Sequence, residues 1–293
     1  MRRSSFFGLR RLSSLGLICA LTLSACHTVR VTSARPETQL PVRFLITFDD
    51  GPSGALENNS SALILDTLAN NRWQNGIKAI FFVQTRHRSG GGTAYGRELM
   101  QRMLDDGHLL GLHTASERGH INHTQMPLTE LEDNLKTGIE DIKALSGEEP
   151  RFIRPPFWSF NAATLSLYEA HGLSMLLDDI SIRDGKVHGV TSNPNVRAHI
   201  HAHLHKAAQR IRAGKVPAVA GYIPLVMTMH DTNPTTARDL ESYLGMLIEE
   251  AQQAGLVVHA QPFISPGEEL VQVANLRAHR SQLALVDELT TSP

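Results

Sequence analysis

The sequence predicts an α/β fold, a single domain organised around a parallel sheet or barrel. From Val42 onward, short apolar runs alternate with longer stretches of helical period. Polar residues capable of chemistry follow several of these runs. The chain has 293 residues and is 41% hydrophobic, which is enough for one sizeable core but too little for two well-built domains.

The elements can be placed along the chain from periodicity and turn residues. We expect strands at 42–47, 77–83, 107–113, 151–154, 173–177, 222–229 and 256–260. We expect helices from Ser60, around 99–104, over 129–145, from Asn161, over 195–213, over 235–254 and once more after Pro266. For the caps we expect Ser60 or Ser61, a capping box from Thr129 to Glu132, and Thr235 or Thr236.

The first 25 residues read as a lipoprotein signal peptide. Arg2, Arg3, Arg10 and Arg11 precede an apolar region, 12–23, that is too short to span a membrane permanently. Leu23-Ser24-Ala25-Cys26 resembles the bacterial lipobox, in which the Cys becomes the lipidated first residue of the mature protein. Residues 26–41 are then a lipidated Cys and tether. The alternative is an ordinary signal peptide with an incidental Cys.

The lipobox predicts a location in the cell envelope, with the membrane reached through the lipid on Cys26. His27 stands where an Asp would indicate retention in the inner membrane, which favours the outer membrane of a Gram-negative cell, on its periplasmic side. The net charge is −1, so no overall basic field attracts nucleic acid. We therefore expect no nucleic-acid partner.

Two adjacent carboxylates, Asp49 and Asp50, follow the first predicted strand, and Gly51-Pro52 turns the chain away. Side chains alternate between the two faces of a strand, so one carboxylate can bind a cation while the other handles a proton. Further polar residues follow other strands: His113, Arg154, Asp184 and His230. In a parallel barrel the carboxyl ends of the strands share one face, where active sites form.

Five segments occur in an order that carries a resemblance: Thr47–Pro52, Lys78–Val83, Gly107–Thr114, Arg154–Phe157 and Met229–Asp231. On these motifs the chain resembles the NodB-type polysaccharide deacetylases, carbohydrate esterase family 4, over roughly residues 42–262. The resemblance implies a distorted (β/α)7 barrel, the NodB homology domain, over 42–265, with a C-terminal helix and tail at 266–293. It also implies a divalent metal and hydrolysis of acetyl groups on a glycan.

Matched position by position, the resemblance implies that Asp50 and His113 ligate the metal together with a second His. The donor set suits zinc, with cobalt, nickel or manganese as competitors. Asp49 is then the base that deprotonates a metal-activated water, and Arg154 orients it.

For the other half of the reaction, the resemblance makes His230 the acid that protonates the departing amine. A carboxylate of the family's fourth motif, Asp-x-x-Asp-Trp, which Ile180–Gly185 matches only in part, pairs with it: Asp184, or alternatively Asp179. Phe157 is expected to bind substrate, and its backbone N–H to help bind the oxyanion.

The chain departs from the family pattern at two places. The position four residues after His113, where the family has its second His, holds Glu117; the next histidines are His120 and His123. We favour His120 as third ligand and leave Glu117 and His123 open. The Trp that follows the last Asp of the fourth motif is absent, because Gly185 follows Asp184.

The expected function is removal of acetyl groups, most simply N-acetyl, from an envelope or exported polysaccharide or an oligosaccharide of it. The two departures keep a second hypothesis open, a catalytically weakened glycan-binding envelope lipoprotein. A third is an amide hydrolase acting on a non-glycan substrate.

Overall fold

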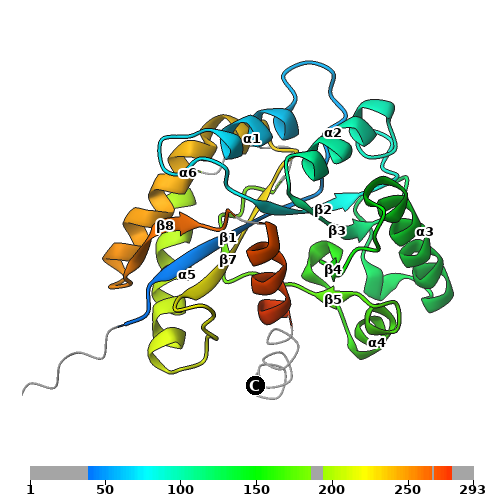
Figure 1. Cartoon of the computed structure of the whole chain (residues 1–293). Coiled ribbons are helices and arrows are strands. Elements are labelled where there is room, and N and C mark those ends of the chain that lie inside the picture. The colour runs from blue at the N-terminus through cyan, green and yellow to red at the C-terminus, as the bar shows by residue number, and fades with distance from the viewer. Residues whose placement is uncertain (1–38, 186–193, 266, 279–293) are drawn as a thin grey trace, which may run out of the picture. The chain divides into compact units, whose positions relative to one another are not determined.

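The computed structural model describes residues 39–185, 194–265 and 267–278 (Figure 1). The predicted signal peptide, Cys26 and the tail after residue 278 lie outside the described residues, so those expectations stay predictions. Among the described helices, none combines the length and the apolar character that crossing a membrane requires.

Eight parallel strands form one sheet in the order β5-β4-β3-β2-β1-β7-β6, and β8 pairs with β1 beside this path. The sheet curls into a distorted barrel, as predicted. The barrel is open, because within the described chain its end strands β5 and β6 do not pair with each other. The strands are β1 Val42–Asp49, β2 Ala79–Gln84, β3 Leu109–Thr114, β4 Phe152–Ile153, β5 Ser174–Met175, β6 Ile180–Ser181, β7 Ile223–His230 and β8 Val258–Phe263.

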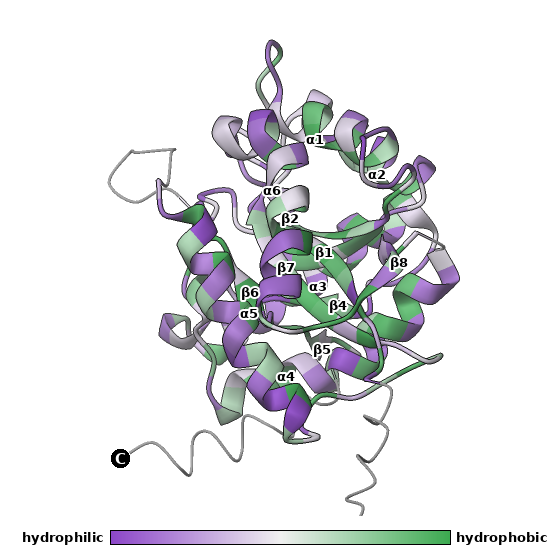
Figure 2. Ribbon diagram, turned by 90° about the vertical axis from the view of Figure 1, so that its left-hand side faces the viewer, coloured by the Kyte–Doolittle hydropathy of each residue, from purple (hydrophilic) through white to green (hydrophobic). Residues whose placement is uncertain are grey.

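The strands lie between two apolar cores. Every residue of β1 is buried, and its alternate side chains divide between the two sides of the sheet: Phe44 belongs to the larger core and Leu45 to the smaller. A strand covered on both faces reads as a continuous apolar run, not as alternation. Figure 2 accordingly shows hydrophobic strands in the interior and helices of mixed colour around them.

The helices cover the larger core. They are α1 Ser60–Ala69, α2 Ala94–Asp105, α3 Leu128–Ser146, α4 Ala162–Ala170, α5 Val196–Arg212 and α6 Pro234–Gln253, with short 3-10 turns at His123–Gln125 and Pro156–Trp158. A further helix over 267–278 packs on the other face of the sheet. Its Leu270, Val273 and Ala274 fill the smaller core against Leu45 and Phe82. This helix therefore closes the inside of the barrel.

All seven predicted strands are present, with ends shifted by at most three residues, but an eighth was missed. Strand β6 has two residues, Ile180 and Ser181, which pair with Met227 and Thr228 of β7. A strand this short has no detectable period in the sequence, and only pairing with β7 defines it.

The predicted helix caps were wrong at three helices. Asn59, not Ser60 or Ser61, caps α1 and accepts a hydrogen bond from the Ala62 N–H at 3.0 Å. Asn233, not Thr235 or Thr236, caps α6. No capping box forms at Thr129, because α3 already begins at Leu128 and Thr129 lies inside it. In the first two cases an Asn lies just before the predicted cap, and its longer side chain reaches the free N–H groups.

Candidate active site

The polar residues singled out in the sequence meet at the carboxyl edge of the sheet. Asp49 at the end of β1 is in register with His230 at the end of β7. On the other side of β1, strand β2 lies between β1 and β3. His113 is the second-last residue of β3. Because the strands are parallel, all these ends open onto the same face.

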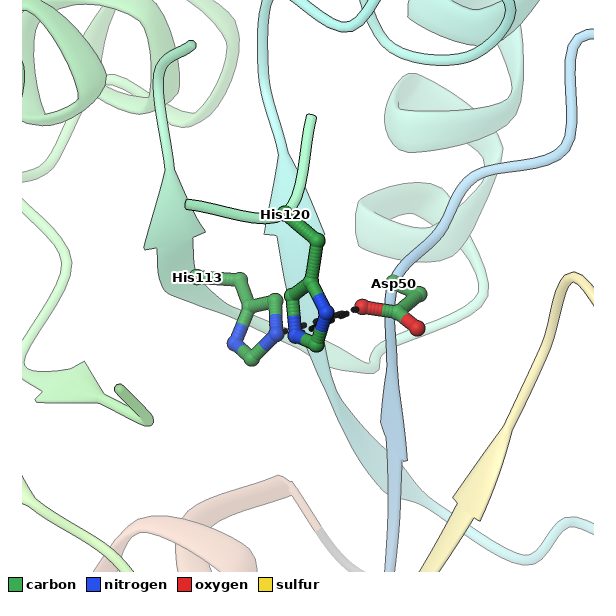
Figure 3. A group of neighbouring side chains, drawn as sticks. All are labelled: Asp50, His113 and His120. Atoms are coloured by element: carbon green, nitrogen blue, oxygen red, sulfur yellow. Dashed lines mark ion pairs between the residues drawn. The ribbon is translucent and has the colours of Figure 1, made fainter. Parts of the chain in front are cut away.

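Asp50, His113 and His120 form a cluster that could hold a metal ion (Figure 3). One ligand atom from each lies within 4.8 Å of the other two. Asp50 Oδ1 is 3.2 Å from His113 Nε2 and 3.5 Å from His120 Nε2. Two ligands about 2.1 Å from one tetrahedral zinc ion lie about 3.4 Å apart, so these separations suit a bound cation.

The tautomer of His113 also indicates that a cation binds in this cluster. Its Nδ1 lies 2.6 Å from the backbone carbonyl of Arg154, which can only accept, so Nδ1 carries the proton. In neutral His113 the Nε2 lone pair then faces the Asp50 carboxylate, and this buried atom has no hydrogen-bond partner in the described part of the chain. Two acceptors this close call for a cation between them, and the donor set fits a divalent metal.

The charge states of the cluster also favour a cation. Burial raises the pKa of Asp50, but the neighbouring imidazoles, His113 foremost, outweigh it and lower the pKa well below its usual range. Burial lowers the pKa of His120 to about 4, against the opposing effect of Asp50. Near neutral pH the cluster therefore offers an ionised carboxylate and a neutral His120 imidazole, as metal ligands must be.

Of the three candidates for the displaced histidine, the structure places His120 in the cluster. A turn brings it there, in which Gly119 has φ +82° and donates its N–H to the Ser116 carbonyl. Glu117 is exposed and lines a different cavity with Arg86 and Asp141.

His123 is fully buried and bonds to the Tyr168 hydroxyl through Nδ1 at 2.8 Å, and burial lowers its pKa to about 3. It belongs to the packing between the 3-10 turn and α4, outside the cluster.

Asp49 pairs with Arg154, whereas Asp50, one residue past the end of β1, lies in the cluster. The left-handed backbone of Asp50, with φ 74°, and not the alternation of an extended strand, separates the two side chains. Arg154 Nη1 donates to Asp49 Oδ1 at 2.7 Å and to Thr47 Oγ1 at 2.7 Å, while Nε donates to the Leu176 carbonyl. Arg154 is completely buried, and its guanidinium lies over the ring of Phe82, 4.2 Å from the centroid. These contacts hold Asp49 in one orientation.

His230 is paired with Asp184, and Asp179 is not its partner. His230 Nδ1 lies 2.7 Å from Asp184 Oδ1, and Asp184 Oδ2 accepts from the His230 backbone N–H. Burial lowers the pKa of His230, but the charge and hydrogen bond of Asp184, helped by Asp50 and Asp49, raise it to about 10. Asp179 instead binds Arg210 and Arg277 and the Val226 N–H.

A cavity of about 360 Å³ opens beside the cluster and reaches both Asp50 and His230. Its other lining side chains include Gln84, His87, Arg118 and His120. Phe157 is 56% exposed, and its ring centroid lies 4.1 Å from that of His120. The backbone of Phe157 is left-handed, with φ 60°, a conformation that costs energy in a non-glycine residue.

Sequence reasoning missed two residues that hold the Asp50 segment. Gln84 donates to Asp50 Oδ1 at 2.9 Å. Asp231 lies against Gly51, where a Cβ would come within 2.1 Å of both its carboxylate oxygens, and it accepts from the Ser61 hydroxyl at 2.7 Å. Gln84 ends β2 and Asp231 follows β7 at the active edge, a position that the sequence could have pointed to, and Asp231 also lies in the matched segment Met229–Asp231.

Fold and site together define a class, the parallel α/β barrels with a candidate metal site at the carboxyl edge of the sheet. Residues 39–176 match the family model described as polysaccharide deacetylase. Over this segment, which is just under half of the chain, the protein is similar to the polysaccharide deacetylase family.

Among curated proteins, the chain is similar to a chitin deacetylase of Pestalotiopsis, with 30% identity over 146 residues, 50% of this chain and 44% of that protein. It is also similar to a peptidoglycan-N-acetylglucosamine deacetylase of Listeria monocytogenes, with 26% identity over 212 residues, 72% of this chain and 37% of that protein. The chain thus spans less than half the length of these relatives.

Among solved structures, the chitin deacetylase of Colletotrichum lindemuthianum superposes with a TM-score of 0.54 at 20% identity, covering 76% of this chain and 86% of that one. At this identity the likeness concerns the fold, and it agrees with the open barrel described above.

Proposed function

We propose that this chain is a metal-dependent hydrolase that removes acetyl groups, N-acetyl in the first place, from an envelope or exported polysaccharide. One observation carries the proposal: the candidate metal cluster lies between two groups prepared for opposite proton transfers. On one side is the Asp49 carboxylate, paired with Arg154, and on the other is the His230 imidazole, paired with Asp184.

The metal is held by Asp50, His113 and His120. We propose zinc, since two imidazoles and one carboxylate are ligands that zinc favours, with cobalt, nickel and manganese as alternatives. When bound, the ion supplies Lewis acidity that polarises the acetyl carbonyl and favours loss of a proton from water. The similarity to the polysaccharide deacetylase family supports a metal-dependent reaction.

Asp49 is the general base. It accepts a proton from the water whose oxygen attacks the acetyl carbon. Arg154 fixes the carboxylate through Nη1 and is itself anchored by Thr47 and the Leu176 carbonyl, so Asp49 cannot rotate away.

His230 is the general acid. With its pKa raised to about 10, it carries a proton at neutral pH and donates that proton to the nitrogen as the carbon–nitrogen bond breaks. Acetate and a free amine on the sugar result. Asp184 keeps His230 protonated and sets the ring so that Nε2, 3.9 Å from Asp50 Oδ2, faces the cluster.

Phe157 borders the substrate position. Its exposed ring beside His120 offers an apolar face on which a sugar ring can stack. The left-handed backbone at Phe157 lies in the turn that follows Arg154, and we assign its N–H to binding the oxyanion.

The substrate class comes from the family, and the location comes from the N-terminal segment. The relatives named above are chitin and peptidoglycan deacetylases, so we propose an N-acetylated glycan here too. A lipid on Cys26 anchors the domain to the outer membrane, on its periplasmic side, within reach of an envelope polysaccharide.

Acetate release tests the proposal. The full chain, stripped of metal and reloaded with zinc or cobalt, is incubated with N-acetylglucosamine oligomers. We expect acetate only from the reloaded protein, and none from Asp49→Asn. Asp239→Asn, which changes a carboxylate paired with Arg238 on α6, serves as control and keeps full activity. Metal binding without acetate from any acetylated glycan contradicts the proposal.

A further inference from the structure

We propose that Gln84 is a positioning residue of the metal site, which fixes the ligand oxygen of Asp50 and couples it to the turn that carries His120. The inference rests on the proposed metal centre and assigns a role to a residue outside the motifs that mark the family.

Gln84 is attached to the Asp50 segment at two points. It is the last residue of β2, and its backbone N–H donates to the Gly51 carbonyl at 2.8 Å. Its side-chain Nε2 donates to Asp50 Oδ1 at 2.9 Å, and the residue is only 5% exposed. Main chain and side chain together therefore hold the loop that follows β1.

The orientation of the amide follows from its partner. An ionised carboxylate only accepts hydrogen bonds, so the Gln84 atom facing Asp50 is the nitrogen. The oxygen it binds, Oδ1, is the same one that lies 3.2 Å from His113 Nε2 and 3.5 Å from His120 Nε2. The Gln84 hydrogen bond occupies one lone pair of Oδ1 and leaves the other for a cation.

The opposite side of the amide lies against the Gly119 turn. A Cβ on Gly119 would be 2.7 Å from Gln84 Oε1 and 2.7 Å from His87 Cδ2. The amide is thus enclosed between Asp50 and the turn that delivers His120, the segments supplying two of the three ligands. Movement of either segment displaces Gln84, and Gln84 transmits the movement to the other.

The unpaired oxygen argues against a role in packing alone. Gln84 Oε1 is buried and has no hydrogen-bond partner among the described residues. Leaving a buried carbonyl unpaired destabilises the fold, a cost that an apolar side chain of the same length avoids. The compensating contact is the hydrogen bond to Asp50.

Gln84→Met tests this role, because Met keeps the length and volume of Gln and removes the donor. Residues that orient metal ligands through hydrogen bonds commonly change affinity by about 10- to 100-fold when they are replaced. We expect Gln84→Met to weaken Zn²⁺ binding by about tenfold or more. Gln101→Met is the matched control, since Gln101 Nε2 also donates to a carboxylate, Asp105 Oδ1, at 2.9 Å but on the exposed face of α2.

The affinity of the metal-free full chain for Zn²⁺ is measured by competition with a chromogenic chelator, and the visible spectrum of the Co²⁺ form reports the ligand geometry. Gln84→Ala is measured beside Gln84→Met so that the result does not depend on the folding of one variant. A purely structural role lowers the melting temperature and leaves affinity and spectrum unchanged.

The inference is overturned if folded Gln84→Met and Gln84→Ala bind Zn²⁺ within about twofold of the unaltered protein, with the same Co²⁺ spectrum. If the unaltered protein binds no metal, this inference and the proposed metal centre fall together. A third outcome separates the two proposals: the unaltered protein binds metal and Gln84→Met weakens that binding, but no glycan releases acetate. In that case the proposed function fails while the role of Gln84 stands.

Discussion

Replacing Asp184 by Asn removes the charge that keeps a proton on His230. The two side chains are nearly isosteric, and the amide oxygen of Asn can still accept from His230 Nδ1, which lies 2.7 Å from the carboxylate now. The substitution removes the negative charge and also places an amide nitrogen where Asp184 Oδ2 now accepts from the His230 N–H and the Thr236 hydroxyl. We expect it to lower the pKa of His230 and to move the alkaline limit of activity with it.

The size of the effect follows from the pKa of His230. A value of about 10 against 6.5 for a free imidazole corresponds to about 5 kcal/mol in favour of the imidazolium. Asp184 is the largest of the contributions that raise the pKa, ahead of Asp50 and Asp49. A hydrogen bond to a charged group is worth about 1.5–3 kcal/mol and a neutral one about 0.5–1.5 kcal/mol. Because Asn keeps the neutral bond, we expect the pKa of His230 to fall by about 1 pH unit.

The contribution of protonated His230 to folding stability should decrease as the pH rises, whereas that of a paired carboxylate increases. Because the pKa of His230 is raised on folding, its contribution is fully present below about pH 6.5 and is lost as the pH rises toward about 10. Asp184→Asn should therefore cost most stability below about pH 6.5 and less at alkaline pH.

Two assays report the effect. An NMR titration of the His230 ring in the metal-free protein gives its pKa directly, and the pH profile of kcat gives the alkaline limb for the loaded enzyme. Asp239→Asn controls for loss of a surface carboxylate. The reasoning is refuted if His230 titrates near 6.5 in the unaltered protein, or if Asp184→Asn leaves both the titration midpoint and the alkaline limb in place.

Three further predictions follow from the site. His120→Ala should abolish stoichiometric zinc binding measured by calorimetry, whereas Glu117→Gln should leave it intact; the reverse result would make Glu117 the ligand. Arg154→Met leaves a buried carboxylate unpaired and should lower the free energy of unfolding in urea by about 3–5 kcal/mol, against about 0–1 kcal/mol for Arg102→Met at an exposed pair. Burial raises the pKa of Asp231 to about 7, so its ionisation destabilises the fold as the pH rises from about 4 through 7. In the metal-free protein, the melting temperature of Asp231→Asn minus that of the unaltered chain should therefore be larger at pH 8 than at pH 5. An equal difference at the two pH values would refute this.

The strands and most residues of the site could be read from the sequence because both depend on local features. Strand β1, buried on both faces, carries the apolar run Phe44-Leu45-Ile46, and the parallel arrangement places the residues that end or follow such strands on one edge. Asp49, Asp50, His113 and His230 were found in this way. Helix starts were less accurate, because Asn59 and Ser60 are both good capping residues and the local sequence does not choose between them.

Which residue joins Asp50 and His113 in the candidate metal cluster was decided only by the tertiary structure. The sequence offered Glu117, His120 and His123 within seven residues, all with side chains that bind metals. The choice depends on the turn at Gly119 and on Tyr168, far along the chain, which takes His123 into the core. The pairing of His230 with Asp184 instead of Asp179 depends in the same way on arginines of α5 and of the helix over 267–278.

Gln84 shows the same division most clearly. The sequence determined that a polar residue ends β2, and nothing near it in the chain indicates a partner. Its hydrogen bond to Asp50 joins residues 34 positions apart, and its enclosure by Gly119 involves a third segment. The sequence by itself determined which residues reach the active edge, because strand period and parallel pairing are local rules. The tertiary structure decided which of them touch, because contacts between loops depend on the paths of several segments at once.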